Sequence, residues 1–367
     1  MQRSIKMLIM LIVTLTITGC SSIINDSLEH DLTNTVYDIN NIEEEKDNSF
    51  EKDILEVHFI DVGQGDSTLI IQGDYSILID GGYNIYGERV VDYIKKQGIN
   101  NINYVIATHP HADHIGGLSD VINAFEIDKV IMPKVAHTTR TYEDFLLAIK
   151  NNGLKIKAPK VGDRYTLGNS DFIIISPSSE SYNNLNDYSV GIKLNHGDNS
   201  FIFTGDAEAT SENEMVNSGI DLRANVLKVP HHGSSSSSTD SFLKAVNPKI
   251  AIFSLGENNS YGHPHREIIK KYENIETYKT DIHGTILVIS NRIEVIVKTE
   301  KNSEINISEN KESENKSNEI FYIGNKNSKV FHLDSCNTLP AEHNRIIFKD
   351  REDAIDSEYR PCGRCNP

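Results

Sequence analysis

Short apolar runs alternate with polar, glycine-containing stretches along most of the chain, and this pattern predicts a mixed α/β fold. Residues 104–107 and 172–175 have the length and the apolar content of buried strands. Residues 87–98 and 142–151 instead place their apolar side chains at helical spacing. Because strands and helices alternate between residues 54 and 298, we expect an α/β sandwich there. The other expected elements are strands in 56–71 (a pair), 76–80, 129–132, 189–194, 200–204, 226–230, 249–254 and 286–297 (a pair), and helices at 117–125 and from 261–265 to about 272.

The first 20 residues have the pattern of a secretory signal rather than that of a folded segment. Arg3 and Lys6 precede an apolar core at residues 7–17, which is too short for a comfortable membrane span. The segment ends in Ile17-Thr-Gly-Cys20, which resembles a bacterial lipobox, and Cys20 would then become the lipidated first residue of the mature protein. The alternative is an ordinary signal peptide that is followed by a cysteine by chance. We expect a protein that is anchored to the cell membrane by lipid and faces away from the cytoplasm.

Much of the net charge of −17 lies outside the expected sandwich. Residues 21–53 are polar, lack periodicity and carry a net charge of −8, so we expect a disordered tether. A linker is expected at residues 299–318, before a small module at 319–367, and residues 299–319 carry a further net charge of −3. No basic face is evident in the sequence, which argues against tight electrostatic binding of duplex nucleic acid.

The densest group of potential metal ligands directly follows the apolar run at residues 104–107. The segment His109-Pro-His-Ala-Asp-His114 places His109, His111, Asp113 and His114 where a strand gives way to a loop. Imidazoles and carboxylates at this density are typical of a site for zinc, manganese or iron rather than for calcium or magnesium. Single histidines are mostly surface or core residues, but that interpretation does not account for four potential ligands in so short a segment.

Further potential ligands stand at other expected strand ends, and a β-sandwich gathers such ends along one edge. Asp80 ends a strand before two glycines, where a carboxylate can orient a metal ligand or a water molecule. Asp206, the pair His231-His232, and His263 follow later strands. This inventory suits two metal ions about 3.5–4 Å apart that hold a bridging hydroxide for attack on an ester.

The remaining polar residues near these motifs receive different interpretations. We assign Asp80 and Asp113 to the catalytic group. His196 belongs to the expected hairpin turn at residues 196–199, so we interpret it as a turn residue and not as a ligand. The serine run at residues 234–238 is either low-complexity sequence or a loop that leaves room for substrate and donates hydroxyl groups.

Five motifs within residues 54–298 resemble the soluble metallo-β-lactamase-like domain of the ComEC competence-protein family. They are His58-Phe-Ile-Asp-Val-Gly-Gln-Gly-Asp66, residues 109–117, Thr204-Gly-Asp-Ala-Glu208, Pro230-His-His-Gly-Ser234 and Tyr261-Gly-His-Pro264. The resemblance implies an αββα four-layer sandwich with two zinc or manganese ions. It implies the following ligands: His109 and His111 for the first ion, Asp113 and His114 for the second, Asp206 as the bridge, one of His231 and His232 to complete the first ion, and His263 to complete the second. Strand alternation does not decide between the two adjacent histidines, because Pro230 breaks the register.

The sequence departs from the superfamily pattern at one position. Many superfamily hydrolases have a further histidine shortly before the bridging aspartate, whereas residues 183–189 contain none. Asn186 or Asp187 is expected to take its place, which would make the first site weaker or richer in oxygen ligands.

The resemblance implies a phosphodiesterase or nuclease-like hydrolase, with DNA among the candidate substrates. With the signal segment, we expect this hydrolysis to take place outside the cell. A lone apolar signal segment cannot form a pore, so we do not expect a role in DNA uptake itself. The alternatives are a hydrolase of another ester, such as a teichoic-acid phosphocholine or a lactone, and a non-enzymatic protein that binds DNA or cell-wall polymer. The sequence indicates no protein partner.

The C-terminal module holds three of the four cysteines, Cys336, Cys362 and Cys365. With His332 they form a pattern that suits a tetrahedral structural zinc ion, which a module this small needs in order to fold. The alternatives are a disulfide with one odd thiol, and His343 as a ligand. The spacing resembles the zinc-binding module of the Ada DNA-repair protein, with His332 in place of one cysteine. The module has no surplus of basic residues, so we do not transfer methyl-transfer chemistry or DNA binding from that family.

Overall fold

The computed structural model describes residues 53–301 and most of residues 322–365. Between 322 and 365 it leaves out residues 334, 335, 337, 342, 343, 349, 350 and 358. The expected signal segment with Cys20, nearly all of the acidic tether, the greater part of the linker and His343 therefore lie outside the described residues. Within the described residues, no helix combines the length and the apolar character needed to cross a bilayer.

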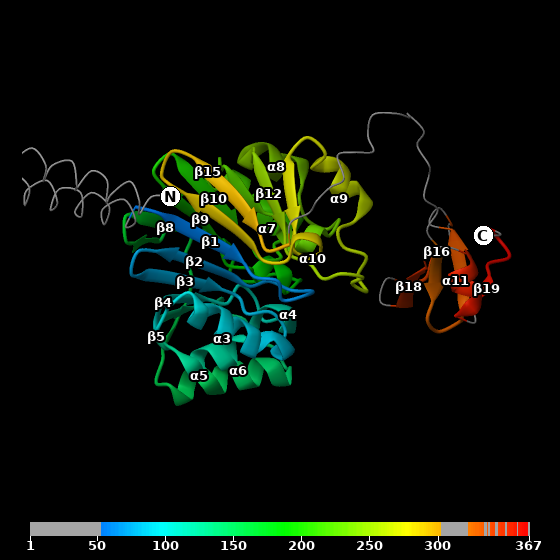
Figure 1. The fold of residues 1–367 in the computed structure, drawn as a ribbon, viewed down its shortest axis with the longest axis horizontal. Coiled ribbons are helices and arrows are strands. Elements are labelled where there is room, and N and C mark those ends of the chain that lie inside the picture. The colour runs from blue at the N-terminus through cyan, green and yellow to red at the C-terminus, as the bar shows by residue number, and fades with distance from the viewer. Residues whose placement is uncertain are drawn as a thin grey trace, which may run out of the picture. The chain divides into compact units, whose positions relative to one another are not determined.

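Two sheets form the centre of residues 53–301 (Figure 1). The first has the strand order β15 (Val295–Thr299), β14 (Ile286–Ser290), β1 (Leu55–Phe59), β2 (Thr68–Gln72), β3 (Tyr75–Ile79), β4 (Asn101–Ile106), β5 (Glu126–Ile131) and β6 (Ile156–Lys157). The second has the order β13 (Glu276–Lys279), β12 (Ile250–Phe253), β11 (Val226–Lys228), β10 (Asn199–Phe203), β9 (Gly191–His196), β8 (Ser170–Ser176) and β7 (Arg164–Leu167).

Helices cover the outer face of each sheet, which gives four layers. The first sheet carries α3 (Gly87–Lys96), α5 (Leu118–Ala124) and α6 (Arg140–Asn151), which Figure 1 shows together beside β3, β4 and β5. The second sheet carries α7 (Ala209–Asn217), α8 (Asp240–Val246) and α9 (Arg266–Lys271). The short elements are η1 (Asn84–Tyr86), α4 (Ala112–Ile115), η2 (Asn186–Tyr188), η3 (Pro230–Gly233) and α10 (Thr280–His283).

Three apolar cores hold these layers together, and strand alternation assigns side chains to them. In β2, Ile70 packs between the two sheets whereas its neighbour Leu69 packs under the helices of the first sheet. Phe59 and Phe201 are fully buried between the sheets, from opposite sides. Burying one such side chain contributes about 1.5–3 kcal/mol, so the sheet-to-sheet core fixes the positions of the strand ends.

Parallel strands bring the chemically important loops to one edge. The strands β3, β4 and β5 run parallel in the first sheet, and β10, β11 and β12 run parallel in the second. Because parallel strands end on the same side, the segments after β3, β4, β10, β11 and β12 leave their sheets at the same end. These are the segments that carry Asp80, residues 109–114, Asp206, the pair His231-His232, and His263.

The expected αββα fold is confirmed, and two local expectations need correction. The helices α7 and α8 were not expected, because α7 has few apolar residues and α8 spans only seven. His196 is not a turn residue: it is the last residue of β9, its side chain is buried, and its Nδ1 lies 2.8 Å from Ser290 Oγ.

The C-terminal module has a sheet of its own. The strand order is β18 (Arg345–Phe348), β16 (Tyr322–Asn325), β17 (Val330–Leu333) and β19 (Arg360–Pro361), with α11 (Arg351–Asp356) against it. Its core consists of Phe331, Phe348, Ala354 and Tyr359, which is small for an independent fold.

Candidate metal centre

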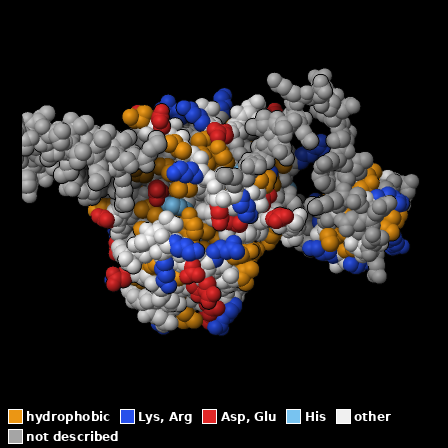
Figure 2. Space-filling model, viewed as in Figure 1, with side chains coloured by type: hydrophobic (Ala, Val, Ile, Leu, Met, Phe, Trp, Pro, Cys, Tyr) orange, Lys and Arg blue, Asp and Glu red, His pale blue; other side chains and the backbone are white. Residues whose placement is uncertain are grey.

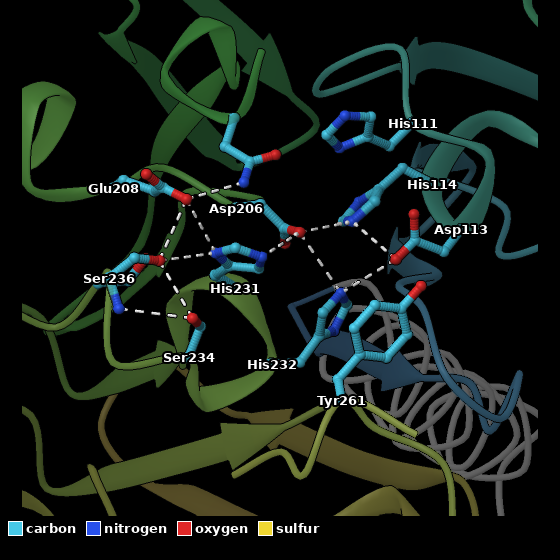
Figure 3. A network of polar contacts seen from close by, with 12 residues as sticks. His111, Asp113, His114, Asp206, Glu208, His231, His232, Ser234, Ser236 and Tyr261 are labelled. Carbon is cyan, nitrogen blue, oxygen red and sulfur yellow. Dashed lines mark hydrogen bonds and ion pairs between the residues drawn. The ribbon is translucent and has the colours of Figure 1, made fainter. Parts of the chain in front are cut away.

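Asp206 is the centre of the polar cluster at the sheet edge (Figure 3). It follows β10 directly after Gly205, and the residue is 2 % exposed. Four imidazole Nε2 atoms lie within 4 Å of its Oδ2 atom: those of His114 at 3.1 Å, His232 at 3.5 Å, His231 at 3.6 Å and His109 at 3.9 Å. One carboxylate oxygen surrounded by four imidazoles has the surroundings expected of a ligand shared by two ions.

The Nδ1 atom of each of these four rings contacts a polar group outside the cluster of Nε2 atoms. His114 Nδ1 lies 2.8 Å from Asp80 Oδ2, and His232 Nδ1 lies 2.8 Å from the carbonyl oxygen of Ser254. Because a carboxylate and a carbonyl only accept hydrogen bonds, both Nδ1 atoms donate, and the lone pair of a neutral ring is then on Nε2. The outer partners therefore select the tautomer that a metal ion requires.

The other two rings are held in the same way by weaker partners. His109 Nδ1 lies 3.1 Å from Thr108 Oγ1, and His231 Nδ1 lies 3.1 Å from Ser236 Oγ and 3.4 Å from Glu208 Oε1. Burial, together with neighbouring imidazoles, holds the pKa of His109 well below its ordinary value, so this ring is neutral and available as a ligand.

Asp80 orients His114 and does not face the cluster itself. Its side chain is fully buried and accepts hydrogen bonds from the Thr108 backbone N–H, at 2.8 Å, and from Thr108 Oγ1, at 2.7 Å, besides that from His114. Its expected role in orienting a ligand fits these contacts. A direct catalytic role does not, because these donors occupy both carboxylate oxygens.

The donor set on one side of Asp206 fits a divalent ion. Single ligand atoms of Asp113, His114, Asp206 and His232 all lie within 4.8 Å of one another. His114 Nε2, His232 Nε2 and Asp206 Oδ1 are buried and make no hydrogen bond. Burial works against a charge on His114 and His232, but the surrounding carboxylates, Asp206 foremost, outweigh it and raise both pKa values well above the ordinary range. The cluster thus attracts positive charge, which a zinc or manganese ion would supply.

The structure differs from the expected division of ligands between two ions. His232 groups with Asp113 and His114, a place that the family resemblance gives to His263. The His263 ring instead stacks on His232 with centroids 6.1 Å apart, and its Nδ1 is buried without a hydrogen bond. Both His231 and His232 face Asp206, because each has a left-handed backbone in η3, with φ of 49° and 53°.

The second group of ligands is more open. His109 Nε2 and His231 Nε2 lie 3.9 and 3.6 Å from Asp206 Oδ2, and His109 Nε2 lies 2.9 Å from His111 Nδ1. Among the described residues, the sets of donor atoms found within 4.8 Å of one another do not include these three histidines. One ion site is therefore more closely assembled than the other.

The segment that lacks the superfamily histidine offers Asn186 rather than Asp187. Asp187 Oδ1 accepts hydrogen bonds from the backbone N–H groups of Glu208 and Ser211 at the start of α7, at 3.2 and 3.1 Å, so it has a structural role. Asn186 Nδ2 donates to Glu208 Oε1 at 2.9 Å, while Asn186 Oδ1 is buried and makes no hydrogen bond. An amide oxygen without a partner remains available as a ligand.

Glu208 is a residue that the sequence interpretation missed. Its carboxylate accepts hydrogen bonds from Asn184, Asn186 and Ser236. Figure 3 shows the contacts of Glu208 with Ser236 and His231. Glu208 ends the motif at residues 204–208, two residues after Asp206, but the sequence pattern indicated no role for it. It fixes both His231 and the segment that lacks the histidine.

A buried ion pair between Asp66 and Lys228 was also missed. Both side chains are almost fully buried, and Lys228 Nζ contacts Asp66 Oδ2 directly. Asp66 Oδ1 lies 3.3 Å from His232 Nδ1. Burial alone would raise the pKa of Asp66, but Lys228 and His232 lower it to about 2. A lysine inside the apolar run at residues 226–229 was the signal in the sequence.

Replacing Lys228 with methionine is expected to destabilise the sandwich by about 3–5 kcal/mol, because Asp66 would keep a buried charge without its partner. The measurement is urea unfolding of the purified protein, read as a shift in midpoint at unchanged slope. The double variant Lys228→Met/Asp66→Asn, which removes both charges, is expected to recover most of the loss.

The matched control is Lys193→Met in the neighbouring part of the same sheet. Lys193 is also largely buried, but its Nζ donates to the carbonyl oxygen of Asp221 at 2.9 Å, and the Asp221 side chain is 54 % exposed. Removing it leaves no buried charge, so we expect a cost of about 1 kcal/mol or less. Equal losses in Lys228→Met and Lys193→Met would contradict the role given to the pair.

The C-terminal module assembles its own set of ligands. Single ligand atoms of His332, Cys336, Cys362 and Cys365 lie within 4.8 Å of one another, and the three cysteines are free thiols. The backbone N–H of Leu333 donates to Cys365 Sγ and that of Arg364 to Cys362 Sγ, each at 3.4 Å. Backbone donors at Cys365 and Arg364 lower the pKa of Cys362 to about 7. These contacts fit a zinc ion better than a disulfide.

Comparison with known proteins gives one family match for the sandwich and one for the C-terminal module. Residues 60–257 match the metallo-beta-lactamase superfamily, and residues 308–367 match the metal binding domain of Ada. "ComE operon protein 3" of Bacillus subtilis is 32% identical over 251 residues, which cover 63% of this chain and 32% of that protein. "Recombination protein 2" of Haemophilus influenzae is 30% identical over 245 residues, covering 65% of this chain and 28% of that protein. The chain thus spans about a third of the length of these curated relatives.

Solved structures with this fold are more distant in sequence. The metallo-beta-lactamase fold protein YhfI from Bacillus subtilis is 14% identical, with a TM-score of 0.42, and the match covers 67% of this chain and all of that one. The resemblance to ComEC-type proteins expected from the five motifs is confirmed by the curated relatives. The match at residues 60–257 covers more than half of the chain, and the chain belongs to the metallo-β-lactamase superfamily.

Proposed function

We propose that this metal-dependent hydrolase of the metallo-β-lactamase superfamily cleaves phosphodiesters, with nucleic acid as the substrate class. The convergence of four imidazole Nε2 atoms on Asp206 Oδ2 is the observation that carries the hydrolytic part. The name of "Recombination protein 2" and the resemblance to the ComEC competence-protein family support a nucleic-acid phosphodiester.

The residues of the chain prepare the centre for this chemistry. Asp113, His114 and His232 would hold one ion, His109, His111 and His231 the other, and Asp206 would be shared. Divalent ions held by these residues would supply a water of lowered pKa and would polarise the ester. Asp80 and the carbonyl oxygen of Ser254 keep the Nε2 lone pairs of His114 and His232 turned towards Asp206. His114 and Asp206 are at most 2 % exposed, so charges in the centre interact at low dielectric.

The location of the protein is a further part of the proposal. We propose that Cys20 carries a lipid and that the hydrolase acts outside the cytoplasm on a membrane anchor. On the face of residues 53–301 seen in Figure 2, acidic and basic side chains are interspersed with apolar ones and form no single basic band. The ions of the centre would supply attraction for a phosphodiester.

The purified, metal-loaded protein is expected to hydrolyse bis-p-nitrophenyl phosphate and a short oligonucleotide, and a chelator is expected to abolish both activities. The variant His109→Ala removes a buried ligand of the more open ion site and is expected to lower kcat/KM by about a hundredfold or more. The assay is release of p-nitrophenolate, together with the metal content of each variant.

The histidine control for this assay is His283→Ala. His283 lies on α10 and its Nδ1 is bonded to the backbone of Lys279, so its removal is expected to leave the activity unchanged. A substrate panel with a lactone and a phosphocholine ester tests the reaction class. Turnover of either of these by metal-loaded protein, with no turnover of phosphodiesters, would contradict the proposal.

A further inference from the structure

Tyr261 is a half-exposed aromatic ring beside the metal centre. It lies in the loop after β12, is 48 % exposed, and is drawn next to His232 and Asp113 in Figure 3. Its ring stacks on His263 with centroids 5.6 Å apart and an interplanar angle of 19°. His263 stacks in turn on His232, at 6.1 Å and 27°. Three nearly parallel rings therefore lead from a buried candidate ligand to the protein surface.

The position of the Tyr261 ring is fixed on one face and at its hydroxyl. His263 packs against one face, and the hydroxyl oxygen lies 3.3 Å from the hydroxyl oxygen of Tyr83 in the loop after β3. Asn259 holds the supporting residue His263 by two hydrogen bonds, accepting from its N–H at 3.0 Å and donating to its carbonyl oxygen at 2.7 Å. A ring that is ordered before a ligand arrives loses little entropy on binding.

The exposed surface of this ring suits one kind of ligand group. A flat aromatic group can stack on a single tyrosine face, and such stacking contributes about 1–3 kcal/mol per nucleobase. A quaternary ammonium group is instead held in a cage of several aromatic faces, and Tyr261 offers one. A stacking partner also requires no charge from the protein. The geometry therefore favours a neutral aromatic ring over a choline headgroup.

We propose that Tyr261 forms a nucleobase subsite next to the metal centre, on which a base of the cleaved strand stacks while a phosphodiester of the same strand reaches the ions that the centre would hold. This inference rests on the proposed phosphodiesterase function and adds a residue that selects the substrate. The column Tyr261–His263–His232 connects the subsite to the centre. Tyr261 and His232 are separated by two ring-to-ring steps of 5.6 and 6.1 Å, so a strand whose base stacks on Tyr261 has a nearby phosphodiester within reach of the centre.

The test compares two substrates of equal length and charge with the full-length, metal-loaded protein. One is an oligothymidylate, and the other carries abasic tetrahydrofuran residues in place of the nucleosides. Tyr261→Leu is expected to raise KM for the oligothymidylate about tenfold and to leave kcat and KM for the abasic strand unchanged. Tyr261→Phe keeps the ring and loses only the hydroxyl contact, so we expect it to retain most of the wild-type KM.

The matched control is Tyr75→Leu. Tyr75 is 47 % exposed and is the first residue of β3, whose other end leads to Asp80, so it lies about 16 Å from the centre along the strand. Its replacement is expected to leave kcat and KM unchanged for both substrates. Unchanged kinetics in Tyr261→Leu would overturn the inference. So would an equal loss on both substrates, which is the result of a merely structural role.

A failure of the phosphodiesterase proposal can be told apart from a failure of the nucleobase subsite. If the wild-type protein cleaves neither strand, the phosphodiesterase proposal fails, and the subsite is tested by equilibrium binding of thymidine monophosphate and of deoxyribose 5-phosphate. About tenfold weaker binding of the nucleotide by Tyr261→Leu, with equal binding of the sugar phosphate, would support the subsite. Equal nucleotide affinity in wild type and variant would overturn it.

Discussion

Replacing Asp206 with asparagine is expected to lower kcat/KM for phosphodiester hydrolysis by about a thousandfold or more, which corresponds to a loss of roughly 4 kcal/mol of transition-state stabilisation. The variant keeps the volume of the side chain and removes its charge. Oδ2 of Asp206 lies within 4 Å of the Nε2 atoms of His109, His114, His231 and His232. A neutral amide cannot serve two cations in that position, so metal content is expected to fall along with turnover.

Two controls separate this effect from a loss of fold. Asp171→Asn alters a carboxylate at the far end of β8, where it pairs with Arg164 and Asn195, and is expected to keep full activity. Thermal unfolding of Asp206→Asn is expected to remain cooperative, because the asparagine introduces no volume change. Wild-type kcat/KM with two bound ions in Asp206→Asn would contradict the central role of this carboxylate.

The position of most of the centre was predictable from strand ends. Residues 109–114, Asp206 and the pair His231-His232 each follow an apolar run, and parallel strands carry such segments to the same edge of their sheet. Hydrophobic periodicity therefore predicted which distant residues meet. It did so because the sheet-to-sheet core, and not the ligands, positions the strands.

The orientation of individual side chains was not predictable in this way. His231 and His232 both face Asp206 because two successive residues have positive φ in η3, a backbone conformation that no periodicity in the sequence indicates. His232, placed by this turn, groups with Asp113 and His114, and its ring stacks with that of His263. Motif spacing gives the inventory of ligands, whereas the local backbone decides which ion each one serves.

Outer residues were missed for a related reason. Lys228 and Asp66 lie in different motifs, and their pairing depends on how β11 sits beside the loop after β1. Glu208 and Asn186 likewise meet only after β10 and η2 are in place. A charged residue in an apolar strand, as with Lys228, signals a buried partner but does not identify it.

The replacement Cys362→Ser is expected to unfold the C-terminal module, the largest effect on stability anticipated in this chain. The described apolar core of the module consists of Phe331, Phe348, Ala354 and Tyr359, which cannot offset the entropy of ordering about 50 residues. Structural zinc in comparably small modules contributes roughly 10–16 kcal/mol of binding free energy, which is at the same time folding free energy. Without a complete Cys₃His set this contribution is lost.

Hydrogen exchange of the full-length protein, together with zinc analysis, measures the effect. In Cys362→Ser, amides of β16 and β17 are expected to exchange as in an unfolded chain and one zinc ion per molecule to be missing, while amides of the sandwich keep their protection. Thr338→Val is the control, because Thr338 Oγ1 lies 3.2 Å from Cys336 Sγ but is not of a ligand type that zinc selects. Full protection of the module in Cys362→Ser, or in wild type after a chelator has removed all zinc, would show that the apolar core suffices and that the four ligands are not what folds it.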